Sequence, residues 1–121
     1  MKILETDYMK LTILNNKIVL VDVADGIEIT KEKTQLGIAM VEKEMPGDYG
    51  VIINRKEDYS FIPVDVYSVH NSHPRMKAIA LVIYDNRIVL PVATEQRLFK
   101  GKLEAFNSVK LAKEWIDSAV D

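Results

Sequence analysis

The chain has 121 residues, which fits one domain and is long enough to bury an apolar core. A net charge of −2 gives no electrostatic basis for binding nucleic acid, and the lack of cysteine excludes disulfides, thiol nucleophiles and thiolate metal ligands. No stretch reaches the ~20 apolar residues of a membrane helix, and Glu5, Asp7 and Lys10 interrupt the N-terminus before a signal peptide could form. We therefore expect one cytoplasmic domain without integral membrane association.

The first two predicted elements are strands. The apolar runs 8–14 and 17–23 flank Asn15-Asn16, and asparagine tolerates the positive φ of a two-residue hairpin turn. Asp25-Gly26 breaks the second run. This pattern predicts an antiparallel hairpin in which an outer strand pairs with an inner one.

A helix is predicted next, beginning after the N-cap Thr30 and ending before Pro46-Gly47. Its apolar face is predicted from six residues: Leu36, Ala39 and Met40, widened by Ile38, Val41 and Met45. Gly37 lies inside this helix, where it costs about 1 kcal/mol relative to alanine. We expect Gly37 to permit close packing against a sheet.

The remaining elements alternate between strand and helix. Residues 49–54 predict a strand, and 62–71 a short helix with Pro63 in its first turn, although Val64 and Val66 also alternate as in a strand. Residues 76–84 form an almost unbroken apolar run, typical of a strand buried on both faces. Pro91 falls within the next segment, 86–99, which predicts a kinked or late-starting helix or an extended start.

The last elements are a short strand at 103–106 and a helix capped by Asn107 or Ser108. One face of that helix carries Ala112, Trp115, Ile116 and Ala119. Together, the elements predict an α/β fold with a mixed five-stranded sheet. Its N-terminal hairpin is antiparallel, its later strands are parallel, and helices cover both faces.

This order of elements resembles the small bacterial SpoIIAA-like proteins, which belong with the STAS and Sec14-like folds. The resemblance covers about residues 8–116. It rests on the buried strand at 76–84, then Leu103-Glu104-Ala105-Phe106, and then a helix with Ala112 and Trp115-Ile116. The anti-sigma-factor antagonists among these proteins carry a phosphorylated serine in an Asp-Ser-Ser-Gly type motif. The corresponding region here, 54–60, has only Ser60 and no Ser-Gly, so the phosphorylation switch is not carried over.

Candidate ligand-binding residues follow from the fold class. Ligands of open α/β sheets bind beyond the carboxyl ends of the parallel strands, where helix N-termini favour anions. The residues at these ends that could line one crevice are Asn54, Arg55, Ser60, Asn86 and Arg87. The competing interpretation is that the asparagines are ordinary caps and the arginines are solvated.

Other polar groups predict no chemistry. His70 and His73 are three residues apart but lack further ligands for a metal, and we expect a solvent-exposed pair. Asp22 and Asp25 are interpreted as turn formers, and Arg97, Lys100 and Lys102 as a solvated basic turn. We expect no catalytic residue, metal or cofactor.

Two functions are consistent with the sequence. The first is a non-enzymatic regulatory or protein-interaction domain of the STAS-like kind, whose partner is another protein or a second copy in a homodimer. The alternative is a domain that binds a small apolar or anionic ligand, such as a lipid or nucleotide, as implied by the resemblance to Sec14-like proteins.

Overall fold

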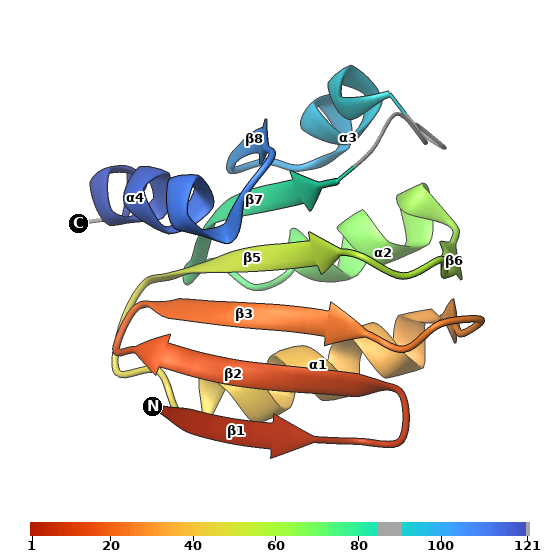
Figure 1. The fold of residues 1–121 in the computed structure, drawn as a ribbon, viewed down its shortest axis with the longest axis horizontal. Helices are drawn as coiled ribbons and strands as arrows, with labels where there is room; N and C mark the ends of the chain where they lie inside the picture. Colours follow the sequence, from red (N-terminus) through yellow and green to blue (C-terminus); the bar gives the residue numbers. More distant parts are fainter. Residues whose placement is uncertain (85–90, 121) are drawn as a thin grey trace.

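A computed structural model describes residues 1–84 and 91–120, in which a twisted sheet lies between helices (Figure 1). The strands, in their order across the sheet, are β1 (Lys2–Glu5), β2 (Met9–Asn15), β3 (Ile18–Val23), β5 (Tyr49–Arg55), β7 (Met76–Ile83) and β8 (Lys102–Phe106). The strands β1 to β3 pair antiparallel, whereas β3, β5, β7 and β8 pair parallel. The predicted mixed sheet, with a hairpin followed by parallel strands, is confirmed.

The sheet has six strands where five were predicted, and β1 is the additional one. Its sequence, Lys2–Glu5, lacks the alternation of a half-buried strand, and only Leu4 is even partly buried. The turn after β1 is held by Thr6, whose Oγ1 accepts hydrogen bonds from the amides of Tyr8 (3.3 Å) and Met9 (3.0 Å). Pairing with β2 therefore determines the conformation of β1, and no local sequence pattern predicts this strand.

The hairpin between β2 and β3 is confirmed, but its turn differs from the prediction by one residue. Asn15 belongs to β2, and the turn consists of Asn16 and Lys17. Asn15 holds the turn through its side chain, whose Oδ1 accepts a hydrogen bond of 2.9 Å from the Lys17 amide. Among the described residues only Gly26 has positive φ, so the left-handed asparagine that we expected does not occur there.

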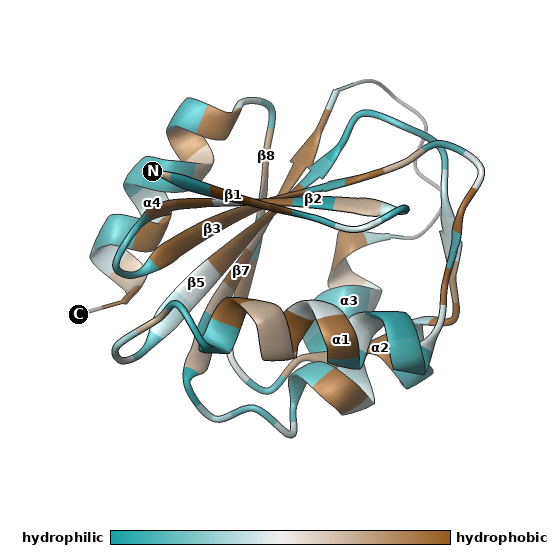
Figure 2. Ribbon diagram, turned by 90° about the horizontal axis from the view of Figure 1, so that it is seen from below, coloured by the Kyte–Doolittle hydropathy of each residue, from teal (hydrophilic) through white to brown (hydrophobic). Residues whose placement is uncertain are grey.

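Helices cover both faces of the sheet, as predicted (Figure 2). The four helices of the described residues are α1 (Lys31–Glu42), α2 (Pro63–His70), α3 (Val92–Leu98) and α4 (Val109–Ala119). The first two lie over one face, α4 lies over the other, and α3 packs beside α2 and β8. No helix in the described part of the chain is long and apolar enough to cross a membrane.

The cap of α1 is confirmed, and its predicted apolar face is confirmed in part. Thr30 Oγ1 accepts a hydrogen bond from the Lys33 amide, whereas Leu36 is 48% exposed and Ala39 is exposed as well. Of the predicted residues, Ile38, Val41 and Met45 are buried. The helix also buries Thr34 and Gly37, so its buried side is rotated away from Leu36 and Ala39.

Gly37 explains which way α1 is rotated. A Cβ at Gly37 would lie 2.8 Å from the Met9 Cε of β2, closer than side chains pack. The side of α1 on which Gly37 lies therefore packs closely against the sheet, which confirms the predicted role of this glycine.

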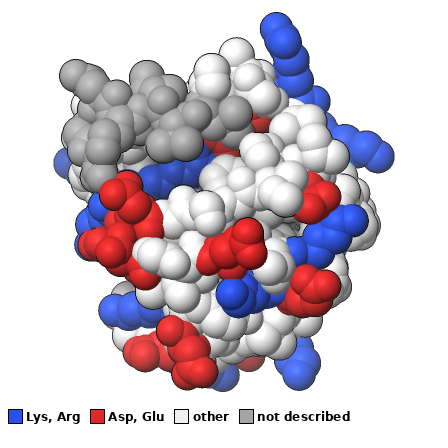
Figure 3. All heavy atoms as spheres, turned by 90° about the vertical axis from the view of Figure 1, so that its right-hand side faces the viewer, with Lys and Arg blue, Asp and Glu red and all other residues white. Residues whose placement is uncertain are grey.

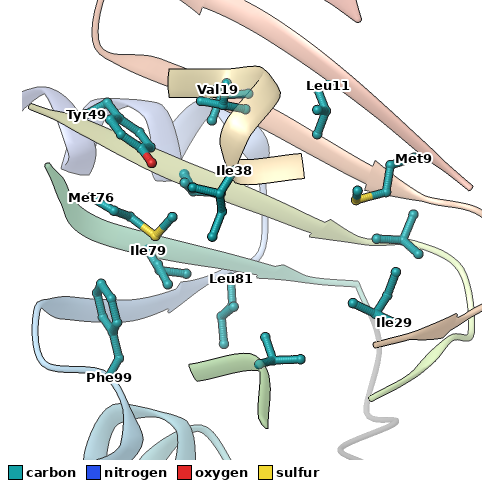
Figure 4. Packing of buried hydrophobic residues seen from close by; sticks show 14 of the residues in the cluster. Met9, Leu11, Val19, Ile29, Ile38, Tyr49, Met76, Ile79, Leu81 and Phe99 are labelled. Carbon is teal, nitrogen blue, oxygen red and sulfur yellow. The ribbon is translucent and has the colours of Figure 1, made fainter. Parts of the chain in front are cut away.

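The strand β7 lies between β5 and β8, and its described neighbours bury it on both faces. Ile79 and Leu81 face α1 and α2, where Figure 4 shows them among the buried side chains. Ala78, Ala80 and Val82 face α4 instead. The central strand predicted at 76–84 is thus confirmed.

The two uncertain segments also have defined structures where they are described. The 62–71 segment is helical, with Pro63 as the first residue of α2. The helix α3 begins directly after Pro91, which confirms a late start; residues 86–90 lie outside the described residues. A second, two-stranded parallel sheet joins β4 (Glu28–Ile29) to β6 (Ser60–Phe61), and Figure 1 shows β6 beyond the end of β5.

Candidate functional site

Of the five residues predicted to line a crevice at the carboxyl ends of the strands, Asn54 and Arg55 lie on opposite faces of the sheet. Successive side chains of a strand point to opposite faces, so Asn54 and Arg55, at the end of β5, are separated by the sheet. Arg55 faces α1 and α2 together with Val51 and Ile53, whereas Asn54 shares the other face with Ile52.

Asn54 is 6% exposed, and its side-chain amide is hydrogen-bonded to neighbouring residues. Its Nδ2 donates to Asp22 Oδ1 of the adjacent strand at 2.8 Å, and its Oδ1 accepts a hydrogen bond from the Tyr84 hydroxyl at 2.6 Å. These bonds make Asn54 and Asp22 a structural pair between the strands. The predicted role of Asp22 as a turn former is wrong, because it belongs to β3. Asp25 does lie in a turn with Gly26, as predicted, and its Oδ1 accepts a hydrogen bond from the Asp58 amide at 3.2 Å.

Ser60 is exposed and belongs to β6, opposite Glu28 of β4. Asn86 and Arg87 lie outside the described residues. Acidic and basic side chains are interspersed over the described surface at this end of the sheet (Figure 3). The five residues therefore stay predictions for a ligand site, and the described geometry directs attention to the interior beside Arg55.

Arg55 forms a buried, bidentate ion pair with Glu95 of α3. Its Nη1 donates to Glu95 Oε2 at 2.8 Å and its Nη2 to Oε1 at 2.6 Å, while the Glu95 side chain is 0% exposed. Burial by itself would lower the pKa of Arg55, but the hydrogen bonds to Glu95 raise it above the usual range. Arg55 therefore keeps its positive charge, and the two hydrogen bonds pair its guanidinium with the Glu95 carboxyl group inside the protein.

Two tyrosines complete this polar cluster. The Tyr67 hydroxyl of α2 donates to Glu95 Oε1 at 2.7 Å, and the Tyr59 hydroxyl accepts from Arg55 Nε at 3.3 Å. Burial, and then the charge of Glu95, raises the pKa of Tyr67 above its usual range, so this phenol stays protonated and donates. The cluster thereby ties β5, α2 and α3 together.

Sequence reasoning missed Glu95 because its partners are distant along the chain. Arg55 precedes it by 40 residues and Tyr67 by 28. The available signal was a single acidic residue within the short segment Val92–Leu98, and this pattern is equally typical of a solvent-facing glutamate.

A cavity of about 90 Å³ lies between the sheet and the helices α1 and α2, next to Arg55. Its walls are mainly aliphatic and come from β2, β3, β5, α1 and α2. Lining residues include Met9, Leu11, Val19, Ile38, Val51 and Val66. Figure 4 shows Met9, Leu11 and Val19 on the same side of the sheet as Ile38. Such a lining suits a small apolar molecule. At about 90 Å³ the cavity is smaller than the engineered cavity of about 150 Å³ that binds benzene, so a single ring or a short chain is the upper limit of size.

Most polar groups of the cavity wall are already hydrogen-bonded. Thr34 Oγ1 donates to the Thr30 carbonyl at 2.9 Å, and the Tyr49 hydroxyl donates to Glu42 Oε2 at 2.8 Å. Arg55, Tyr59 and Tyr67 belong to the cluster around Glu95. These groups hold the wall together.

His70, at the end of α2, is the exception. It lines the cavity, is 7% exposed, and its Nδ1 is buried without a hydrogen-bond partner in the described part of the chain. Its ring packs against Tyr67, with centroids 5.3 Å apart, and edge-on against Phe99 at 6.4 Å. Burial, followed by repulsion from His73, lowers the pKa of His70 to about 4, which keeps its imidazole neutral at pH 7.

The expected solvent-exposed histidine pair is therefore wrong. His73 is separated from His70 by the end of α2 and contacts Glu42, with its Nδ1 3.3 Å from Oε1. The described residues contain no group of three or more His, Asp or Glu side chains that could hold a metal ion. Arg97, Lys100 and Lys102 are exposed, which agrees with their interpretation as a solvated cluster.

Comparison with known proteins adds no relative: no family model, no curated protein and no solved structure matches this chain. The resemblance to SpoIIAA-like proteins stays a prediction, and the function has to be inferred from the geometry of the cavity.

Proposed function

We propose that this protein is a binding domain for a small, mainly apolar molecule, which occupies the cavity between the sheet and the helices α1 and α2. The observation that carries the proposal is the cavity itself: about 90 Å³ lined mainly by aliphatic side chains. Protein interiors are normally packed without voids of this size, and each such void reduces stability. A ligand that fills the space would recover the lost packing.

The surroundings of the cavity support binding and provide little for catalysis. The ionisable side chains beside it include Arg55, Glu95 and Tyr67, and these three are hydrogen-bonded to one another. The proposal therefore takes the protein as a carrier or sensor rather than an enzyme. The resemblance to Sec14-like lipid carriers implies ligands of similar apolar character.

Toluene is a suitable first probe, because it is apolar and has the size of one ring. We expect saturable chemical-shift changes of cavity-lining amides in ¹H–¹⁵N spectra when toluene is added. In the variant Val66→Phe the added ring enters the cavity, and toluene binding should be lost.

The matched control is Val64→Phe, the same substitution on the same helix at a site that is 63% exposed. This control should bind toluene as the unchanged protein does. The proposal would be abandoned if toluene caused no saturable shifts in the unchanged protein, or if Val66→Phe, shown to be folded, bound it equally well.

The second candidate function is interaction with a protein partner or a second copy. It is favoured by β1, which pairs only with β2 among the described strands and therefore presents an open edge. Light scattering of the purified protein tests the homodimer version: a dimer that the edge substitution Ile3→Pro converts to monomer would support it, and a monomer at high concentration would count against it.

A further inference from the structure

The cavity has one unoccupied polar group in its wall, the imidazole of His70. The other polar side chains of the wall have hydrogen-bond partners within the protein, whereas Nδ1 of His70 has none among the described residues. A buried polar group without a partner costs about 1 to 3 kcal/mol. A ligand in the cavity with a polar group within reach of this nitrogen would remove that cost.

The electrostatics of the wall select a neutral ligand. Arg55 lines the cavity, but its charge is cancelled by Glu95 through two hydrogen bonds. The ring of His70 is held between Tyr67 and Phe99, surroundings that favour the uncharged imidazole. An anionic or cationic ligand would enter an apolar space without an available opposite charge, which is strongly unfavourable.

A hydroxyl group is the neutral polar group that fits His70 best. A neutral imidazole has one ring nitrogen that donates and one that accepts, and either nitrogen can carry the hydrogen. A hydroxyl both donates and accepts, so it satisfies His70 in either tautomer, whereas a carbonyl or an ether can only accept.

Building on the proposed function, we propose that the ligand of the cavity is a small apolar alcohol or phenol whose hydroxyl group hydrogen-bonds the imidazole of His70. The aliphatic walls from β2, β3 and α1 bind the hydrocarbon part. The size of the cavity, about 90 Å³, limits that part to about one ring or a short chain.

Phenol and toluene are a matched pair of probes, since they differ only by a hydroxyl in place of a methyl group. Their dissociation constants would be measured for the unchanged protein and for His70→Phe, which keeps an aromatic ring between Tyr67 and Phe99. We expect phenol to bind the variant about three- to tenfold more weakly, and toluene to bind both proteins within about twofold.

The variant His70→Gln restores a donor and an acceptor and should recover part of the phenol affinity. If the His70 variants do not fold, the ring ¹⁵N shifts of His70 in the unchanged protein give a second measurement. These shifts should change on saturation with phenol and stay constant with toluene.

The outcomes separate the two proposals. If neither probe binds, the proposed function fails together with this inference. The hydroxyl assignment is overturned if toluene binds but His70→Phe weakens phenol binding no more than toluene binding. It is also overturned if the ring ¹⁵N shifts of His70 do not change when phenol is added. In both cases the cavity remains a ligand site.

Discussion

The pair Arg55 and Glu95 is the most consequential contact between single residues in the described structure. A carboxylate with 0% exposure depends on its counter-charge, because desolvation of an unpaired ion is costly. The pair also connects the end of β5 to α3, and through Tyr67 to α2. Its loss should therefore reduce the stability of the whole domain.

We predict that Arg55→Met lowers the free energy of unfolding by about 3 to 5 kcal/mol, because it leaves Glu95 buried and unpaired. Urea denaturation at pH 7 measures this change. The double variant Arg55→Met/Glu95→Leu, in which both charges are replaced by apolar groups, should regain most of it. Lys2→Ala, which removes the exposed pair with Glu44, serves as a control and should cost less than about 1 kcal/mol. A cost for Arg55→Met as small as that of the control would contradict this account.

His70 makes a pH-dependent contribution to stability. Its pKa is about 4 in the folded protein, below the usual 6.5, so the unfolded chain binds a proton that the folded protein does not over the range between these values. Stability from this group is therefore complete above about pH 6.5 and declines as the pH falls towards 4.

We predict that the unchanged protein loses about 2 to 3 kcal/mol more than His70→Phe between pH 7.5 and pH 4.5, in addition to losses that both proteins share. Urea denaturation at the two pH values measures the difference. Parallel losses in both proteins would show that His70 is not held neutral by its surroundings.

The contact between β5 and α4 leaves no room for an added side chain at Gly50. A Cβ at Gly50 would lie 2.5 Å from Cγ2 of Ile116, a branch fixed close to the helix backbone. The missing side chain on β5 thus lets α4 approach the sheet.

We predict that Gly50→Ala lowers the free energy of unfolding by about 1 to 3 kcal/mol, the usual cost of overpacking a core. Gly47→Ala is the control: nothing lies within 4 Å of its added Cβ, and its effect should be within about 0.5 kcal/mol. Thermal or urea unfolding compares the two. A Gly50→Ala protein as stable as the control would mean that α4 shifts without cost.

Elements with a strong local signal were predictable from the sequence. The start of α3 after Pro91, the cap Thr30 and the apolar run of β7 each depend on a few neighbouring residues. The strand β1 and the rotation of α1 were not predictable, because each is decided by contact with β2. Tertiary contact overrides local pattern in both cases.

At the scale of the whole molecule, the candidate site lay beyond the reach of sequence patterns. The expected crevice followed a rule about strand ends, and that rule does not say which face of β5 each residue occupies. The cavity arises where side chains from several strands and helices leave a space between them, and such a space has no sequence signature. His70 was expected to be solvent-exposed together with His73, whereas its ring lies among Tyr67 and Phe99.

The position of α4 has a consequence for synthesis of the protein. This helix covers the face formed by Ile18, Ile52 and Val82, yet the ribosome makes it after all six strands. A nascent chain therefore carries a nearly complete sheet with one apolar face exposed to solvent. Exposed apolar surfaces of this kind promote aggregation and are bound by chaperones. Until residues 109–119 emerge and dock, the growing protein depends on its surroundings to stay apart from its neighbours.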